Sequence, residues 1–242
     1  AELDLNDVTF TANGRQRTLS SWLAESQCDG MIVLQQGAIV AERYDNRMSE
    51  RQPHIIFSVT KSVTALLCGI LAGQGLLDPD KPVTHYIPEV AKSGWGDATV
   101  RHVLDMQASL DFDEVYLATE GAFIRYREST GWNPVDPAKA TDLRGFLATL
   151  GRREGPHGKR FRYLSPNSDL LGWLCERAGG RPYAELLSTL LWQPMGAERP
   201  ANLTVDRLGA PRAAGGLCVT LRDLARIAEM VRCRGLADGR QV

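Results

Sequence analysis

The spacing of apolar residues predicts two strands and a turn near the N-terminus. Gly30–Leu34 and Ala38–Ala41 are apolar and contain β-branched residues, and only Gln35–Gly37 separates them. Two such runs joined by a short turn that contains glycine are typical of a β-hairpin. Trp22 and Leu23, which precede the first run, predict a short amphipathic helix beside it.

Helical spacing dominates the middle of the chain. After Phe57, apolar side chains recur at every third or fourth position, which predicts a helix over Ser58–Leu71. Further helices are predicted over Thr99–Met106, Thr141–Leu150, Asp169–Ala178, Pro182–Trp192, and from a Thr220 cap to near Gly235. Glu120–Pro137 carries several glycines and prolines and is expected to be a long loop. Strands first and helices afterwards indicate a mixed α/β or α+β architecture.

Composition excludes several classes of protein. The 242 residues carry 28 Lys and Arg against 29 Asp and Glu, a net charge of −1, so no basic excess is available to bind nucleic acid. Apolar residues make up 43% of the chain, which is enough for a folded core and argues against disorder. The longest apolar stretch, Val63–Ala72, is too short to span a bilayer, so we expect no membrane segment.

Cysteine usage indicates the compartment. The five cysteines are odd in number, scattered and never spaced as C-x-x-C. This pattern fits free thiols in a reducing compartment better than a disulfide framework. No signal peptide is visible, so we expect a cytoplasmic protein, although a processed secreted chain would have the same sequence features.

Several common catalytic motifs are absent from the sequence. His54, His85, His102 and His157 lack the spacing of metal-binding histidines. Neither G-x-S-x-G nor a Walker A pattern occurs. We therefore expect no metal ion and no other cofactor, and the four histidines are expected to be ordinary core or surface residues.

What remains is Ser58-x-x-Lys61 at the head of a predicted helix. Residues three apart lie on one face of a helix, so the lysine amine can approach the serine hydroxyl. A serine hydroxyl is a poor nucleophile until a base takes its proton, and a lysine is such a base only in its neutral form. A buried helix and its positive N-terminal dipole both disfavour a cation at this position. The spacing alone is a weak signal, because it arises readily by chance.

A second proton-carrying group lies much later in the chain. Tyr163–Asn167 is expected to form a loop just before the helix at Asp169. A tyrosine oxygen there could share a proton with Lys61 and pass it to a leaving group. The alternative is that Tyr163 is an amphipathic side chain at the start of a helix, with a structural role only.

Taken in order, these and other segments resemble a known family. They are Ile32–Tyr44, Phe57–Ser62, Gly75–Pro79, Val83–Glu89, Val103–Gln107, Tyr163–Ser165, Gly215–Gly216 and Asp223–Arg226. Together they resemble the serine β-lactamase-like superfamily, and within it the 6-aminohexanoate-dimer hydrolases and related esterases. Val103–Gln107 is more diagnostic than the rest, because class C β-lactamases and the esterase branches usually have a His-Thr-Ser-Gly-like sequence there.

The resemblance implies an α+β fold of the β-lactamase/transpeptidase type, with an antiparallel sheet flanked by helices and a mainly helical lobe. Residues 1–242 would form one such unit, with residues 1–57 and about 205–242 in the sheet-containing lobe and about 58–204 in the helical lobe. The family continues well past the helix over Leu221–Arg234. The resemblance therefore implies that the C-terminal strands of the sheet are missing from the chain.

By position, the resemblance makes Ser58 the nucleophile, Lys61 its base and Tyr163 the partner in proton transfer. It implies hydrolysis of an amide or ester bond in a small linear acyl substrate through an acyl-enzyme. The Ser58 N–H would form half of an oxyanion hole. The alternatives are a β-lactamase or D-amino-acid peptidase, or an inactive β-lactamase-like binding module, and homodimer formation is left open.

The resemblance also implies where substrate binds. Tyr116 and Trp132 stand at positions that contact the leaving side of the substrate in that branch, and Trp132 could act as a lid. Ser165 is a further substrate-binding candidate. Tyr116 and Trp132 could equally be an aromatic pair that anchors a long loop. Ala214 stands where the 6-aminohexanoate-dimer hydrolases have a polar asparagine that helps to position substrate, so the same substrate is not expected.

Overall fold

The computed structural model describes residue 4, residues 8–135 and residues 141–242. The chain folds into two compact units. The terminal unit consists of Ala1–His54, Pro194–Asn202 and Cys218–Val242, and the central unit of Ile55–Gln193 and Leu203–Leu217. A three-stranded sheet, in the order β5 (His54–Ile55), β7 (Leu217–Val219) and β6 (Asn202–Leu203), contains the points at which the chain passes from one unit to the other.

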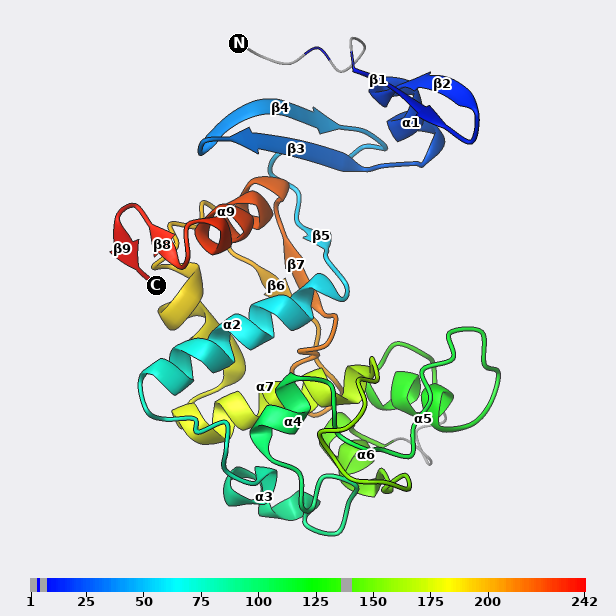
Figure 1. Ribbon diagram of the computed structural model, residues 1–242, viewed down its shortest axis with the longest axis vertical. Coiled ribbons are helices and arrows are strands. Elements are labelled where there is room, and N and C mark those ends of the chain that lie inside the picture. The colour runs from blue at the N-terminus through cyan, green and yellow to red at the C-terminus, as the bar shows by residue number, and fades with distance from the viewer. Residues whose placement is uncertain (1–3, 5–7, 136–140) are drawn as a thin grey trace. The chain divides into compact units, whose positions relative to one another are not determined.

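Antiparallel strand pairs characterise the terminal unit (Figure 1). Its elements are β1 (Thr9–Ala12), β2 (Arg15–Thr18), α1 (Leu19–Glu25), β3 (Gly30–Gln35), β4 (Ala38–Tyr44), α9 (Leu221–Arg232), β8 (Leu236–Ala237) and β9 (Arg240–Gln241). Strands β3 and β4 form the predicted hairpin, with Ile32 opposite Glu42. Helix α1 confirms the short helix predicted at Trp22.

Helix α9 begins at the predicted Thr220 cap. The Thr220 Oγ1 atom accepts a hydrogen bond from the Asp223 N–H at 3.2 Å, which satisfies one of the helix's free N–H groups. The Asp223 carboxylate accepts a hydrogen bond from the Glu198 N–H at 2.8 Å. Arg222 donates two hydrogen bonds, of 2.8 and 2.7 Å, to Glu42 on β4. The paired bonds from Arg222 to Glu42 join α9 to the hairpin within the terminal unit.

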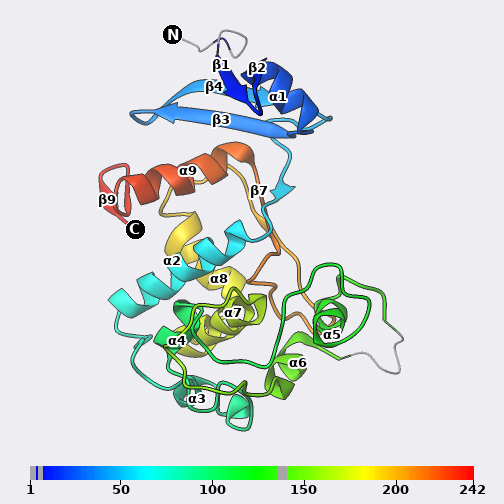
Figure 2. The ribbon, with the colours of Figure 1, turned by 45° about the vertical axis from the view of Figure 1, so that its right-hand side comes forward.

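Helices make up much of the central unit (Figure 2). They are α2 (Val59–Gly73), α3 (Val83–Tyr86), the 3₁₀ turn η1 (Pro88–Val90), α4 (Val100–Leu104), α5 (Ala122–Ser129), α6 (Leu143–Thr149), α7 (Ser165–Gly179), α8 (Tyr183–Leu187) and the π-helical turn η2 (Ser188–Trp192). Helices α2 and α7 pack against each other, and α7 is buried from Ser165 to Cys175. Together the two units confirm the α+β class.

The prediction of one long loop over Glu120–Pro137 is wrong, because α5 lies inside it; residues 136 and 137 are outside the described residues. Gly121 and Gly131 have φ angles of 91° and 71° and stand just outside the two ends of the helix. Glycine adopts such angles readily and therefore often marks a helix end. Between them, Phe123 and Tyr126 are buried one turn apart on a single face.

Helix α7 begins four residues earlier than predicted, at Ser165 instead of Asp169. Pro166 lies in its first turn, where a missing N–H costs no hydrogen bond. The consequence is that Ser165 and Asn167 belong to the helix and not to the loop before it. Among the described residues, none of the helices has the length and apolar character needed to cross a membrane.

Candidate active site

The candidate nucleophile Ser58 lies directly before α2, at its N-cap. The preceding residue, Phe57, has a φ angle of 41°, which is uncommon for a bulky side chain. No described residue accepts a hydrogen bond from the Ser58 N–H. A free N–H at a helix N-terminus can act as a donor to an oxyanion.

Ser58 and Lys61 are brought together as the sequence predicts. Lys61 Nζ lies 2.9 Å from Ser58 Oγ and donates a 2.7 Å hydrogen bond to the Ala214 carbonyl oxygen. A neutral amine has two N–H groups and one lone pair, so an N–H on the Ala214 oxygen leaves the lone pair free to face the Ser58 hydroxyl. The observed positions of the two side chains are therefore compatible with Lys61 as the proton acceptor.

The segment after Ala213 is held to α2 by side chains of that helix. Thr64 Oγ1 lies 2.9 Å from the Ala213 carbonyl oxygen, and Thr60 Oγ1 accepts a 3.2 Å hydrogen bond from the Leu217 N–H. Both threonines are fully buried. Together with the bond from Lys61, these contacts fix the backbone that faces the lysine amine.

Asp169 holds the same segment from the side of α7. Its Oδ1 atom accepts a 2.8 Å hydrogen bond from the Ala214 N–H, and its Oδ2 atom accepts one from the Tyr126 hydroxyl. Burial raises the pKa of Asp169, and the nearby positive charge of Arg212 opposes that rise. Three residues further along α7, Gly172 gives room for Ala213, because an added Cβ would lie 2.5 Å from the Ala213 Cβ.

A cavity of about 290 Å³ in the central unit opens onto the nucleophile. Its walls contain Ser58, Lys61 and three further predicted site residues: Tyr116, Trp132 and Ser165. It is also lined by Phe57, Glu114, Phe123, Tyr126, Arg127, Thr204, Arg212, Ala214 and Gly215. The described lining is mainly aromatic and apolar around a few charged groups, as in many small-molecule sites.

Tyr163 lies beside Lys61 but is not among the residues that line this cavity. Lys61 Nζ lies 5.0 Å from the centre of the Tyr163 ring, a cation–π arrangement. The Tyr163 hydroxyl forms no hydrogen bond with any residue that the structure describes. The Tyr163 ring therefore lies close to Lys61, and its hydroxyl is not engaged by the described part of the chain.

Glu114 is a site residue that the sequence analysis missed. Its Oε2 atom accepts a 2.6 Å hydrogen bond from the Ser165 N–H, and its Oε1 atom accepts bonds from Ser165 Oγ at 2.8 Å and Tyr116 Oη at 2.6 Å. A carboxylate at the first N–H of α7 caps the helix and complements its dipole. Burial, followed by the hydrogen bond to Glu114, raises the pKa of Tyr116. Glu114 thus fixes two predicted substrate-binding residues at once.

Trp132 and Phe57 are partly exposed aromatic residues at the rim of the cavity. Their rings meet edge to face, 5.9 Å apart, and each side chain is about half exposed, at 49% for Trp132 and 52% for Phe57. Aromatic rings with so much exposed area are available for contact with an apolar chain. This geometry places Trp132 next to the nucleophile segment.

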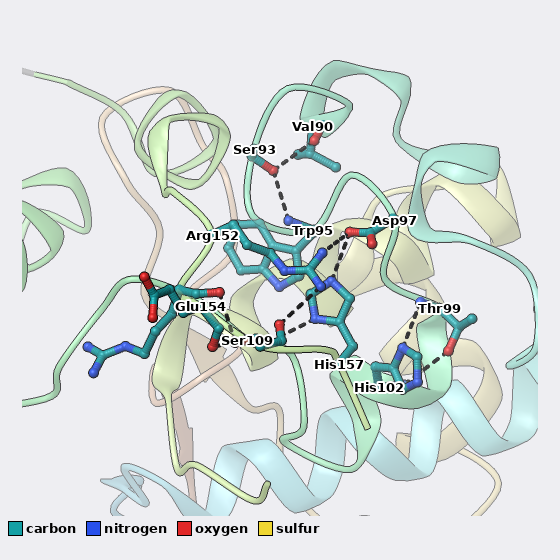
Figure 3. A network of polar contacts seen from close by, with 12 residues as sticks. Val90, Ser93, Trp95, Asp97, Thr99, His102, Ser109, Arg152, Glu154 and His157 are labelled. Atoms are coloured by element: carbon teal, nitrogen blue, oxygen red, sulfur yellow. Dashed lines mark hydrogen bonds and ion pairs between the residues drawn. The ribbon is translucent and has the colours of Figure 1, made fainter. Parts of the chain in front are cut away.

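Ser109, His157 and Asp97 also lie close together in the central unit (Figure 3). Their arrangement differs from that of a catalytic Ser-His-Asp triad. His157 Nε2 lies 3.0 Å from Asp97 Oδ1, but His157 Nδ1 accepts a 2.8 Å hydrogen bond from the backbone N–H of Ser109. The Ser109 hydroxyl donates instead to the Arg153 carbonyl oxygen, at 3.3 Å. His157 therefore does not face the serine hydroxyl as a general base must, and the cluster ties loops together.

The fold and the Ser58–Lys61 pair fit the class of serine β-lactamase-like proteins. The family model described as Beta-lactamase matches residues 23–242. The chain therefore belongs to the beta-lactamase family.

Its relatives include hydrolases of two kinds. The chain is 38% identical over 224 residues to 6-aminohexanoate-dimer hydrolase from Paenarthrobacter ureafaciens, and the match covers 93% of this chain and 57% of the relative. It is 30% identical over 203 residues to the esterase EstB from Burkholderia gladioli, and that match covers 78% of this chain and 49% of the relative.

Among solved structures, a Bacillus anthracis protein provisionally assigned as a 6-aminohexanoate-dimer hydrolase superposes with a TM-score of 0.92. That protein is 26% identical, and the match covers 100% of this chain and 63% of the other. The chain thus spans about half to three fifths of the length of the relatives it matches. The resemblance inferred from the sequence motifs is confirmed.

Proposed function

We propose that the protein is a serine hydrolase that cleaves an amide or ester bond of a small linear acyl substrate. The observation that carries this proposal is the 2.9 Å approach of Lys61 Nζ to Ser58 Oγ at a cavity of substrate size. The similarity to 6-aminohexanoate-dimer hydrolase and to an esterase supports the same bond types.

In the proposed first step, neutral Lys61 takes the Ser58 proton while Oγ attacks the acyl carbonyl carbon. The carbonyl oxygen becomes an oxyanion, which the Ser58 N–H stabilises. Collapse of the tetrahedral species breaks the bond to the amine or alcohol, which receives the proton through Lys61 and the Tyr163 hydroxyl. An acyl group remains on Ser58 Oγ.

In the second step, water loses a proton to the same pair and attacks the acyl carbon. The ester bond to Ser58 breaks, the proton returns to Oγ, and the carboxylic acid leaves. In this scheme Tyr116, Trp132 and Ser165 contact the substrate. Ala214 offers no polar side chain there, which supports a substrate different from that of the relatives.

Fluorophosphonate labelling of the full-length protein tests the proposal. We expect one adduct on Ser58, detected by intact mass and peptide mapping, and none in Ser58→Ala. Lys61→Ala should abolish labelling and acylation, and Tyr163→Phe should slow acylation. Absence of an adduct on wild-type Ser58 would favour an inactive binding module.

A substrate panel separates the enzyme alternatives. Short p-nitrophenyl esters, linear amides and a chromogenic cephalosporin should be compared by kcat/KM. We expect the linear esters and amides to be preferred. Faster turnover of the cephalosporin would instead support a β-lactamase or D-amino-acid peptidase.

We also propose a cytoplasmic location. None of the five cysteines forms a disulfide bond, and Cys68 Sγ and Cys175 Sγ lie 3.4 Å apart in the core without one. Free thiols in such close contact are typical of a reducing compartment. Fractionation of cells that produce the protein, with thiol titration of each fraction, tests this location.

A further inference from the structure

Positively charged side chains outnumber negatively charged ones among the described residues that line the cavity. Arg127 and Arg212 are cationic, and Glu114 is the single carboxylate among the described lining residues. Glu114 is already occupied, since it accepts hydrogen bonds from Ser165 and Tyr116. The cavity therefore offers positive charge to a ligand and little free negative charge.

Among the described lining residues, Arg127 is a cation without a protein partner. It lies on α5, is half-buried and lines the cavity. Its guanidinium forms no hydrogen bond or ion pair with any residue in the described part of the chain. A guanidinium without a protein partner keeps its five N–H donors free, and a planar anion can bind such a group in bidentate fashion.

Arg212 lies against the same helix. Its Nη1 atom donates a 2.9 Å hydrogen bond to Thr130 Oγ1, and its guanidinium stacks over the Tyr126 ring at 5.0 Å. Thr130 follows Arg127 by three residues at the end of α5, so the two positions lie on one face, one turn apart. Arg212 is fixed by protein contacts and adds positive charge to the wall that carries Arg127.

We propose that the cavity selects linear substrates with a net negative charge, whose carboxylate pairs with Arg127 in the field of Arg212. This proposal rests on the hydrolase function proposed above. It names a substrate class, carboxylate-bearing esters and amides without a compensating ammonium group. An ammonium-bearing acyl chain would meet two guanidinium groups and be disfavoured.

Three esters of equal chain length test this charge preference. The p-nitrophenyl monoester of adipic acid is anionic, p-nitrophenyl hexanoate is neutral, and the p-nitrophenyl ester of 6-aminohexanoic acid is cationic. We expect kcat/KM for the anionic ester to exceed that for the neutral one by about tenfold, with the cationic ester slowest. In these three esters the charge lies in the acyl group. A second pair places it in the leaving group: the butanoyl ester of para-hydroxybenzoate is anionic, and that of para-hydroxybenzamide is neutral.

Arg127→Gln should bring the ratio of anionic to neutral kcat/KM close to one, and Arg127→Lys should restore part of it. Arg125→Gln is the matched control, because Arg125 is an exposed residue of the same helix that does not line the cavity. Its ratio should equal that of the wild type. Added salt should reduce the wild-type ratio.

No anionic preference in either ester series, or a preference that Arg127→Gln leaves unchanged, would overturn the proposal. Calorimetric titration with adipate, hexanamide and 6-aminohexanoate gives a readout that needs no turnover. The hydrolase function would be rejected if no ester were hydrolysed and no fluorophosphonate adduct formed. The anion site would then still be supported if the wild type bound adipate and Arg127→Gln did not. If the wild type did not bind adipate either, the anion site would also be rejected.

Discussion

The carboxylate of Asp169 is hydrogen-bonded to the backbone N–H of Ala214 at 2.8 Å. The carbonyl oxygen of the same alanine accepts a 2.7 Å bond from Lys61 Nζ, which in turn lies 2.9 Å from Ser58 Oγ. A buried acid is thereby connected to the candidate base through a single residue. Asp169 is in this sense a positioning residue, because it acts on Lys61 only through Ala214.

Asp169→Asn tests this connection. The substitution removes a negative charge near Arg212 and Lys61 and forces Tyr126 to change its hydrogen bond. We expect the rate of Ser58 acylation to fall by roughly tenfold, with kcat lowered more than KM is raised. The pH profile of acylation should also shift, which a purely structural defect would not cause. Asp105→Asn, an exposed aspartate in the same unit, is the control, and equal effects of both changes would contradict this role.

Gly172→Ala tests how closely α7 approaches the same segment. The new Cβ would lie 2.5 Å from the Ala213 Cβ, and neither atom can rotate away. We expect the backbone at Ala213 to shift, with a loss of about 1–3 kcal/mol in unfolding free energy and a slower acylation. The control is Gly69→Ala in α2, where the added Cβ has no neighbour within 4 Å. That variant should be neutral or slightly more stable in urea unfolding, because alanine favours the helix.

The parts of the site that the sequence predicts correctly depend on local geometry. Ser58 and Lys61 meet because residues three apart share a helix face, and the β3–β4 hairpin follows from two short runs and a turn. The predicted start of α7 is four residues late, although Pro166 is a typical first-turn residue. The prediction of a loop at α5 is wrong because the glycines that flank the segment lie at the ends of a helix. The sequence signal for this helix is the spacing of Phe123 and Tyr126, three residues apart.

The remaining site residues depend on contacts between distant parts of the chain. Glu114 meets Ser165 across 51 positions, and Asp169 meets Ala214 across 45. No periodicity or motif marks an acid that caps a helix so far away. Arg212 likewise reaches Thr130 across 82 positions. Such pairings are set by how helices pack, which local patterns do not encode.

His157 is expected to make stability depend on pH. Burial lowers its pKa from the ordinary value of 6.5, and Nδ1 can accept the Ser109 N–H only while that nitrogen is unprotonated. As pH falls below about 6.5, the unfolded chain binds a proton at this histidine more readily than the folded chain does. The unfolding free energy should therefore be highest above that pH and decrease on acidification.

Urea unfolding between pH 5 and pH 8 measures this dependence. His157→Asn keeps an acceptor near the Nδ1 position but does not titrate, so the slope in that range should become shallower. The exposed His85 is the control position, and His85→Asn should retain the wild-type slope. A wild-type slope in His157→Asn would show that other groups cause the pH dependence.

Trp132→Ala should change substrate range more than stability. The side chain is 49% exposed and meets Phe57 edge to face, so its removal should lower the unfolding free energy by less than about 1 kcal/mol. If Trp132 covers the acyl chain, kcat/KM for hexanoyl esters should fall several-fold while that for acetyl esters changes little. Trp22→Ala is a matched control, because Trp22 is also partly exposed and edge to face with Phe10 in the terminal unit. An equal loss for acetyl and hexanoyl esters would mean that Trp132 only supports the loop at the rim and does not contact the acyl chain.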